Sequence, residues 1–224
     1  MTWVKICGMT NLNDALVAVE AGADAVGFVF HPSSPRNVKP ENVASIVPLL
    51  PAETEKVGVF VGDSVGGIES KRRIVHQARL TAIQAYSAPS IQTLKDWLSL
   101  NIKVIVAWPA DRIIRGRLGG SKWRTEAKGK IRAILIDSGS REQMGGTGKA
   151  FDWVKAATVL SAIDGFDFVA AGGLTPENVS GAIQTLKPWG VDVVSGVEAS
   201  PGKKDPEKVR AFVRAVREMD RRVG

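Results

Sequence analysis

The chain has few of the residues that build disulfides and metal centres. Its 224 residues include one cysteine, Cys7, and two histidines, His31 and His76. One thiol allows no disulfide within the chain and suits a reducing, cytoplasmic environment. One cysteine and two histidines also give no zinc-ligand spacing. We therefore expect no metal site and a cytoplasmic protein.

Long apolar runs and targeting signals are missing as well. No apolar stretch approaches the ~20 residues of a membrane-spanning helix. The first residues lack the basic start and apolar region of a signal peptide. Hydrophobic residues make up 44% of the chain, which is ordinary for a globular protein with a sizeable core. We expect one domain over residues 1–224 and no membrane partner.

Acidic residues are outnumbered, and the net charge is +7. The excess gathers in residues 112–132 and again in 210–222. A basic protein raises the question of nucleic acid, but no RNA-binding signature, zinc-finger spacing or basic loop with interleaved aromatics accompanies these charges. We interpret them as solvated helical faces, with attraction of a small polyanionic substrate as the functional alternative. No nucleic-acid partner is expected.

Short Val- and Ile-rich runs alternate with longer amphipathic stretches along the whole chain. The amphipathic stretches predict helices over 11–21, 40–50, 64–78, 90–100, 149–163, 176–186 and 205–221. The apolar runs predict eight strands, at 2–7, 24–30, 55–61, 80–85, 102–107, 132–137, 167–171 and 191–195. Strands that alternate with helices in this way form parallel sheets with right-handed crossovers.

Eight such units in about 220 residues predict an α/β fold, a single (β/α)8 TIM barrel. The alternative is an open, doubly wound sheet. That fold usually has fewer strands and a glycine fingerprint after the first, whereas here the first turn reads Cys7-Gly8-Met9-Thr10. Asn11, Thr175-Pro176 and Asp205-Pro206 are suited to begin helices. The stretch 108–130 fits the repeat poorly, and we expect one short basic helix over 111–118 and a loop after it.

Active sites of such barrels lie at the C-terminal ends of the strands, where two reactive side chains stand here. Cys7 ends the first strand and Asp137 the sixth. Cys7 is either a buried core residue or a base whose pKa positive neighbours such as Lys5 or Arg36 lower. Asp137 is either a general acid whose pKa burial raises, or a helix cap or salt-bridge partner. A Cys-His pair is possible only through His31.

Glycines follow the last two strands. Gly172 and Gly173 come after the seventh strand, and Ser195 and Gly196 after the eighth. Barrels commonly bind phosphate at these two loops through backbone N–H groups, and glycine lets the backbone approach the anion. The plain alternative is that the glycines only make turns. We favour a phosphate site because the two loops follow adjacent strands.

A third glycine-rich run, Gly145 to Lys149, lacks the requirements of a nucleotide-binding P-loop. Such a loop needs a glycine separated by four residues from its Gly-Lys pair, and Ser or Thr after the pair, but Gln143 and Ala150 stand there. A lid over the substrate suits this run better.

These motifs together resemble phosphoribosylanthranilate isomerases, enzymes of tryptophan biosynthesis. The matching stretches occur in family order from one end of the chain to the other: VKICGMT (4–10), GFVFHPSSPR (27–36), VGVFV (57–61), LIDS (135–138), GGTGKAFDW (145–153), AAGGLTPENV (170–179) and SGVEASPGKKD (195–205).

The resemblance implies a cofactor-free Amadori rearrangement of N-(5′-phosphoribosyl)anthranilate to 1-(o-carboxyphenylamino)-1-deoxyribulose 5-phosphate. Asp137 matches the family's acid and Cys7 its base. Arg36 looks like the residue that contacts the anthranilate carboxylate, and Gln84 like the family's glutamine on strand four. The four residues of the glycine loops match the phosphate site. The partner is then a small phosphorylated substrate, and the protein a monomer or a homodimer.

Two places depart from the family pattern. After strand four the family usually reads Gln-Leu-His-Gly, but here Tyr86 replaces the histidine. The family's Lys-Ala-x-x-Val at the end of strand five is replaced by Val-Ala-Trp-Pro-Ala over residues 106–110. Neither change touches the acid or the base.

Two other functions compete with this one. The related sugar isomerase of histidine biosynthesis performs the same rearrangement on a substrate with two phosphates, but it usually has Asp where Cys7 stands and a second phosphate loop after strand three. A barrel that lost catalysis and became a binding module is the other alternative, and the intact Cys7, Arg36 and Asp137 argue against it.

Overall fold

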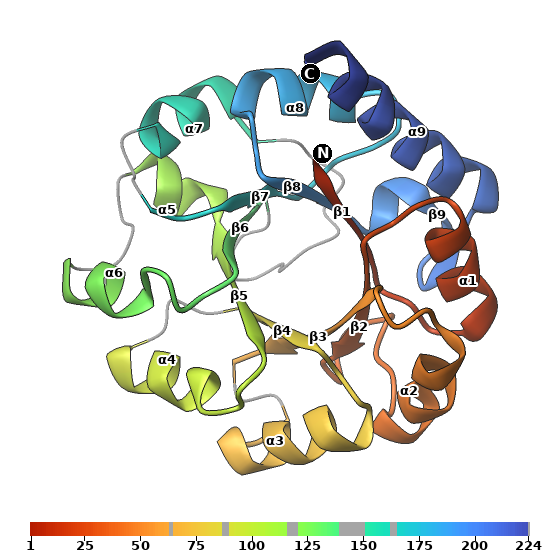
Figure 1. Ribbon diagram of the computed structural model, residues 1–224, viewed down its shortest axis with the longest axis vertical. Coiled ribbons are helices and arrows are strands. Elements are labelled where there is room, and N and C mark those ends of the chain that lie inside the picture. Colours follow the sequence, from red (N-terminus) through yellow and green to blue (C-terminus); the bar gives the residue numbers. More distant parts are fainter. Residues whose placement is uncertain (63–64, 87–89, 116–120, 139–150, 162–164, 224) are drawn as a thin grey trace.

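Eight parallel strands form a closed barrel at the centre of the structure (Figure 1). The computed structural model describes residues 1–62, 65–86, 90–115, 121–138, 151–161 and 165–223. The strands are β1 (Trp3–Cys7), β2 (Ala25–Phe30), β3 (Glu55–Val61), β4 (Ala82–Tyr86), β5 (Lys103–Pro109), β6 (Ala133–Asp137), β7 (Phe168–Ala170) and β8 (Gly190–Val193). Each pairs with the next, and β8 pairs with β1. This confirms the predicted barrel and excludes the open sheet.

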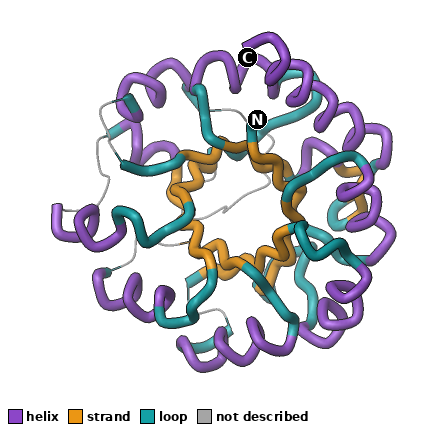
Figure 2. The backbone as a smooth tube through the Cα atoms, in the orientation of Figure 1, coloured by secondary structure: helices purple, strands orange, loops and turns teal. Residues whose placement is uncertain are grey.

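Helices surround the ring of strands on all sides (Figure 2). They are α1 (Leu12–Glu20), α2 (Pro40–Ile46), α3 (Ile68–Gln77), α4 (Ile91–Leu98), α5 (Ala110–Ile114), α6 (Ser121–Ala127), α7 (Trp153–Leu160), α8 (Val179–Leu186) and α9 (Pro206–Val223). Two 3-10 turns, η1 (Val47–Leu49) and η2 (Ser195–Val197), and a small antiparallel pair, β9 (Glu198–Ser200) and β10 (Lys203–Lys204), complete the fold. The described part of the chain contains no helix that is long and apolar enough to cross a bilayer.

Two of the predicted helix starts are confirmed and one is wrong. The Asn11 side chain accepts a hydrogen bond from the Asp14 N–H at the start of α1, and the Asp205 carboxylate accepts two at the start of α9. Thr175 does not begin α8, which starts at Val179 after a turn. In that turn the Thr175 carbonyl accepts from the Asn178 and Val179 N–H groups, so the hydrogen-bonded turn precedes the helix proper.

The basic segment after β5 is more ordered than its sequence pattern predicts. Instead of one helix and a loop, the structure has α5 and α6, separated by residues 116–120, which lie outside the described part. Trp108 of β5 packs on Trp123 of α6 with ring centroids 4.8 Å apart, and Phe166 packs on the far side of Trp123. This aromatic contact holds α6 against the barrel, while its basic side chains point to solvent, as expected.

The inner face of the barrel changes in character along its axis. Because side chains alternate along a strand, positions 3, 5 and 7 of β1 all face inward. The N-terminal half of the interior is apolar and consists of Trp3, Ala25, Val57, Ala82, Ile105, Ala133, Leu135 and Val169. The C-terminal half holds buried polar side chains, which include Lys5, Gln84, Asp137 and Asp192. The polar side chains that line pockets thus lie at one end of the barrel, whereas Glu55, which pairs with Lys103, is a buried charged residue at the other end.

Candidate active site

The eight residues selected from the sequence line two adjacent pockets at the C-terminal ends of the strands: Cys7, Arg36 and Gln84 in one, and Asp137, Gly172, Gly173, Ser195 and Gly196 in the other. Asp192 and Val194 line both pockets and join them. The structure therefore brings all the selected residues to one continuous site.

Cys7 lies beside a buried ion pair. Lys5, two residues earlier on the same inner face, is fully buried, and its Nζ lies 2.8 Å from the Asp192 Oδ1 on β8. Lys5 and Asp192 are register partners in the β1–β8 pairing, so closure of the barrel creates this ion pair. The Lys5 charge also acts on the Cys7 thiol, two residues along the strand. The carboxylate and the thiol therefore share one buried ammonium group.

Burial, more than the positive charge, governs the thiol. Loss of water raises the pKa of Cys7, the Lys5 ammonium lowers it, and the result is a pKa above the usual value. The sequence-based expectation of a lowered pKa was therefore wrong for the unliganded protein, although Lys5 acts in the expected direction. His31 lines the same pocket, but the largest charge effect on the thiol comes from Lys5.

Gly27 explains how the thiol and the ammonium fit together. It pairs with Cys7 across β1 and β2. A Cβ atom at position 27 would lie 2.5 Å from the Cys7 Sγ and 3.0 Å from the Lys5 Cε. Any side chain there would push both groups away, so the missing Cβ is part of the site.

Arg36, in the loop after β2, is held by a carboxylate from the segment that follows β8. Its Nε and Nη2 donate to the two oxygens of Glu198 at 2.8 and 2.7 Å, a bidentate pair. The buried Lys204 Nζ lies 3.0 Å from the Glu198 Oε1. Burial disfavours the charge on Glu198, but the Arg36 and Lys204 interactions outweigh it and hold the pKa of this carboxyl below its usual value. Glu198 therefore remains ionised and orients the guanidinium.

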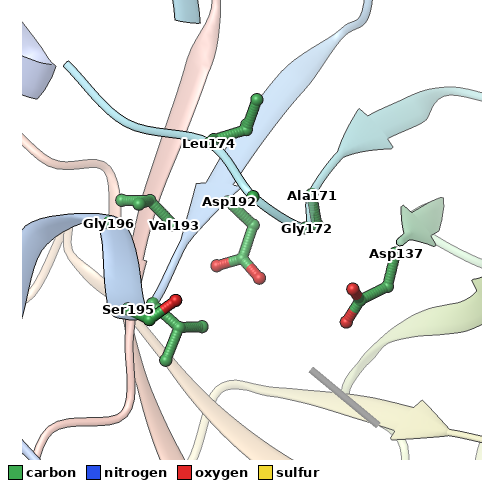
Figure 3. Close-up of a pocket in the computed structure, with 10 residues that line it drawn as sticks. Asp137, Ala171, Gly172, Leu174, Asp192, Val193, Ser195 and Gly196 are labelled. Atoms are coloured by element: carbon green, nitrogen blue, oxygen red, sulfur yellow. The ribbon is translucent and has the colours of Figure 1, made fainter. Parts of the chain in front are cut away.

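Asp137, at the end of β6, accepts a hydrogen bond from Tyr86, so the expectation that the change at position 86 leaves the acid untouched was wrong. The Tyr86 hydroxyl on β4 lies 2.6 Å from the Asp137 Oδ2. Burial and the neighbouring Asp137 charge hold the pKa of Tyr86 well above its usual value, so the phenol keeps its proton. Figure 3 shows the Asp137 and Asp192 carboxylates extending from β6 and β8 into the same pocket.

The glycine loops after β7 and β8 pack closely on one another and on β6. Gly172 and Gly173 adopt left-handed conformations, with φ of 78° and 68°. A Cβ at Gly196 would lie 1.9 Å from the Leu174 carbonyl oxygen, so the two loops touch through Gly196. The glycines therefore have a packing role, and at the same time they leave backbone groups on the pocket wall.

Gln84 lies in the middle of β4 rather than at its end, and its side chain faces the pocket that contains Cys7. Its Oε1 is buried and has no hydrogen-bond partner among the described residues. Buried polar atoms almost always have a partner. An unpartnered amide oxygen on a pocket wall is suited to accept a hydrogen bond from a ligand.

Comparison with known proteins gives a consistent result. The family model for N-(5′-phosphoribosyl)anthranilate isomerase matches residues 4–215. The isomerase of Trichlorobacter lovleyi is 39% identical over 97% of this chain and 99% of its own length.

Two solved structures agree with that match. A monomeric variant of the dimeric isomerase from Thermotoga maritima superposes with a TM-score of 0.79, at 36% identity over 97% of this chain and 100% of its own. A phosphoribosylanthranilate isomerase in complex with reduced 1-(o-carboxyphenylamino)-1-deoxyribulose 5-phosphate gives 0.77, with the same identity and coverage.

The chain belongs to the N-(5′-phosphoribosyl)anthranilate isomerase family. The family resemblance inferred from sequence motifs is thereby confirmed. The run Gly145 to Lys149, interpreted as a lid, lies outside the described residues. Across the described ranges no cluster of three His, Cys, Asp or Glu side chains is arranged to hold a metal ion.

Sequence reasoning missed Asp192 and did not find the partners of Arg36 and Asp137. A signal for Asp192 was present, because it is a charged residue inside an otherwise apolar strand, as Lys5 is in β1. Two opposite charges on strands that must meet when the barrel closes predict an ion pair. Glu198 and Tyr86 gave no comparable signal, since their partners are far away in the sequence.

Proposed function

We propose that this site carries out the isomerisation of its family, with Asp137 as general acid and Cys7 as general base. As a family member, the chain is an aldose–ketose isomerase of tryptophan biosynthesis that converts N-(5′-phosphoribosyl)anthranilate to 1-(o-carboxyphenylamino)-1-deoxyribulose 5-phosphate. The observation that carries the proposal is the pair of joined pockets, which presents a carboxyl group and a thiol to one bound sugar beside two glycine loops.

The first step requires an acid. Asp137 gives a proton to the ring oxygen of the furanose while the C1–O bond breaks, and the lone pair of the anthranilate nitrogen forms a C1=N iminium. The ring oxygen leaves as a hydroxyl group on the opened chain. Asp137 ends the step as a carboxylate, which the Tyr86 hydroxyl stabilises.

The second step requires a base. The Cys7 thiolate removes the proton from C2, and the electrons of that C–H bond form the C1=C2 bond of an enolamine as the iminium nitrogen becomes neutral. The enolamine then tautomerises to the ketose. Because burial raises the pKa of Cys7, the Lys5 ammonium is needed to keep the thiolate accessible near neutral pH.

The two ends of the substrate carry negative charge, and the site has a group for each. Arg36, fixed by Glu198, is placed to bind the anthranilate carboxylate beside Cys7. Gln84 offers its unpartnered Oε1 to a donor on the substrate. Gly172, Gly173, Ser195 and Gly196 supply backbone N–H groups for the phosphate on the side of Asp137.

We further propose a cytoplasmic enzyme without a cofactor that is active as a monomer or a homodimer. The single thiol supports a reducing compartment. The existence of both dimeric and monomeric forms of the Thermotoga maritima isomerase supports leaving both assembly states open for this chain.

The decisive experiment generates the unstable substrate in place from anthranilate and phosphoribosyl pyrophosphate with a transferase, and follows its consumption by fluorescence. We expect rapid consumption by the parent protein and a loss on the order of 10²–10⁴-fold in Asp137→Asn. The matched control is Asp167→Asn, which makes the same change at an exposed position at the opposite end of the barrel and should leave the rate unchanged.

Two results would contradict the proposal. A folded Asp137→Asn protein with the parent rate would remove Asp137 as the acid. Consumption no faster than the spontaneous background by the parent protein would contradict the activity itself, and the two-phosphate substrate of histidine biosynthesis would then be the next one to test.

A further inference from the structure

Tyr86 and Asp137 lie on two strands of the barrel that are separated by one other strand. β5 lies between β4, which carries Tyr86, and β6, which carries Asp137. At this level of the barrel β5 contributes only Ala107, the register partner of Tyr86 and a member of the same inner cluster. The small Ala107 side chain leaves room for the phenol ring to reach past β5, and the hydroxyl meets the Asp137 Oδ2 at 2.6 Å.

The two oxygens of Asp137 therefore have different surroundings. Oδ2 accepts the hydrogen bond from the Tyr86 hydroxyl. Oδ1 lies on the side of the β7 loop, where a Cβ at Gly172 would come within 2.7 Å of it. That loop lines the pocket that holds the phosphate glycines. The hydrogen bond from Tyr86 therefore fixes the carboxyl group through Oδ2, while Oδ1 lies toward the pocket of the phosphate glycines.

We propose that Tyr86 is a positioning residue for the acid: its hydroxyl fixes the Asp137 carboxyl and stabilises the carboxylate that remains after ring opening. This inference rests on the proposed role of Asp137 as general acid. Tyr86 itself exchanges no proton with the substrate, because burial and the Asp137 charge keep its pKa high.

The hydrogen bond from Tyr86 has opposite effects on the pH range in which Asp137 is protonated and on the rate of the proton transfer. It favours ionised Asp137, so it narrows the pH range in which the acid is protonated. It also stabilises the charge that develops on Asp137 as the proton leaves, which speeds the step wherever the acid is protonated. The other titratable groups of the described residues that face this end of the barrel interior are Asp192 on β8, Lys5 and Cys7 on β1, and His31 and Arg36 after β2. A change at Tyr86 leaves them in place.

Tyr86→Phe tests the inference because it removes one oxygen and keeps the ring. We expect kcat to fall about 10- to 100-fold, the effect of losing one hydrogen bond to a charged group, with a much smaller change in KM. We also expect the alkaline limb of the pH profile of kcat/KM to move to higher pH, since the ionised acid has lost a donor. A purely structural role would not move this limb.

Tyr86→His is the second variant, because it keeps an N–H donor at the same position. It should retain more activity than Tyr86→Phe and an alkaline limb closer to that of the parent. If Tyr86→Phe fails to fold, as judged by circular dichroism, the same two quantities are read from Tyr86→Leu, which also lacks a donor. Parent values of both kcat and the alkaline limb in the folded variant would overturn the inference.

Asp137→Asn separates this inference from the proposed function. If Asp137→Asn is inactive and Tyr86→Phe behaves like the parent protein, only the role of Tyr86 is wrong. If Asp137→Asn is fully active, the acid itself has been misassigned. In the Asp137→Asn background, Tyr86→Phe should cause no further loss, since there is then no acid to position.

Discussion

The two ends of the barrel interior are built from the same eight strands but differ in what they bury. The N-terminal end is filled by apolar side chains such as Trp3, Val57 and Leu135. At the C-terminal end the same inner face buries Lys5 and Asp192. Burying charge is costly even when it is paired, and packed apolar side chains in place of a buried ion pair are often as stable or more stable. This end therefore gives up stability to hold reactive groups. The comparison indicates that one end maintains the fold and the other performs the chemistry.

The largest expected effect comes from removing the base at the polar end. Cys7→Ser should lower kcat on the order of 10²–10⁴-fold, because a hydroxyl is a far weaker acid than a thiol and supplies no anion to act as the base. The melting temperature should change little, since the two side chains are similar in size. Fluorescence kinetics together with thermal unfolding check both statements. A folded Cys7→Ser protein with parent activity would remove Cys7 from the mechanism.

Lys5→Met should affect both fold and chemistry, because it leaves the buried Asp192 carboxylate without its partner. Breaking one side of a buried pair costs about 3–5 kcal/mol of unfolding free energy. The pKa of Cys7 should also rise further, since the Lys5 charge opposes the effect of burial. A base works when deprotonated, so the acidic limb of kcat/KM should move to higher pH.

Asp192→Asn is the matched control for Lys5→Met. The Asp192 charge raises the pKa of Cys7, so its removal should move the same acidic limb to lower pH. Limbs that move in the same direction in both variants would contradict this electrostatic account of the thiol.

Leu135→Ala tests the apolar end. Leu135 is fully buried on β6, two residues before Asp137. Its truncation should cost about 2–5 kcal/mol of unfolding free energy through lost burial and the remaining cavity. The rate per folded molecule should stay near that of the parent. Urea unfolding and kinetics at low temperature measure the two quantities separately, and a large loss of kcat with little loss of stability would break the division between the two ends.

Lys103→Gln should have the smallest effect. Lys103 is half exposed at the N-terminal end of β5 and pairs with Glu55, to which Arg132 also lies close, at 3.6 Å. Glu55 is buried, but the Lys103 end of the pair is in water and Arg132 remains beside the carboxylate, so the loss should be about 0–1 kcal/mol and salt should screen it. Urea unfolding at low and high salt should therefore show a small loss that vanishes in high salt, with unchanged activity. A salt-independent loss of several kcal/mol would show that the apolar end also depends on charge.

The fold was largely predictable from the sequence because its signal is repeated eight times. All eight predicted strands match the observed ones within two residues at each end. The segment around α6 failed because its helix is held by Trp123 packing on Trp108, a tertiary contact rather than a local pattern. Local periodicity reports which face of an element is apolar, but it does not report what that face will meet.

Single residues of the candidate site could be selected from the sequence, but the contacts between them could not be predicted. Position at a strand end was enough to select Cys7 and Asp137. It was not enough to predict that Tyr86 would bind Asp137, since the two lie 51 positions apart and their meeting depends on a small residue on β5. The direction in which the pKa of Cys7 shifts also depended on burial, and the position of a residue at a strand end does not tell how buried it is.

Closure of the ring through β1 and β8 has a consequence for the order in which the protein folds. Lys5 and Asp192 are 187 positions apart, so their pairing closes nearly the longest loop the chain can make. Contacts between distant segments form late, because closing the loop between them costs conformational entropy before the contacts themselves can stabilise the chain. We therefore expect the surroundings of the thiol to be completed in the last stage of folding, when β8 joins β1, so that recovery of activity reports the final event of refolding.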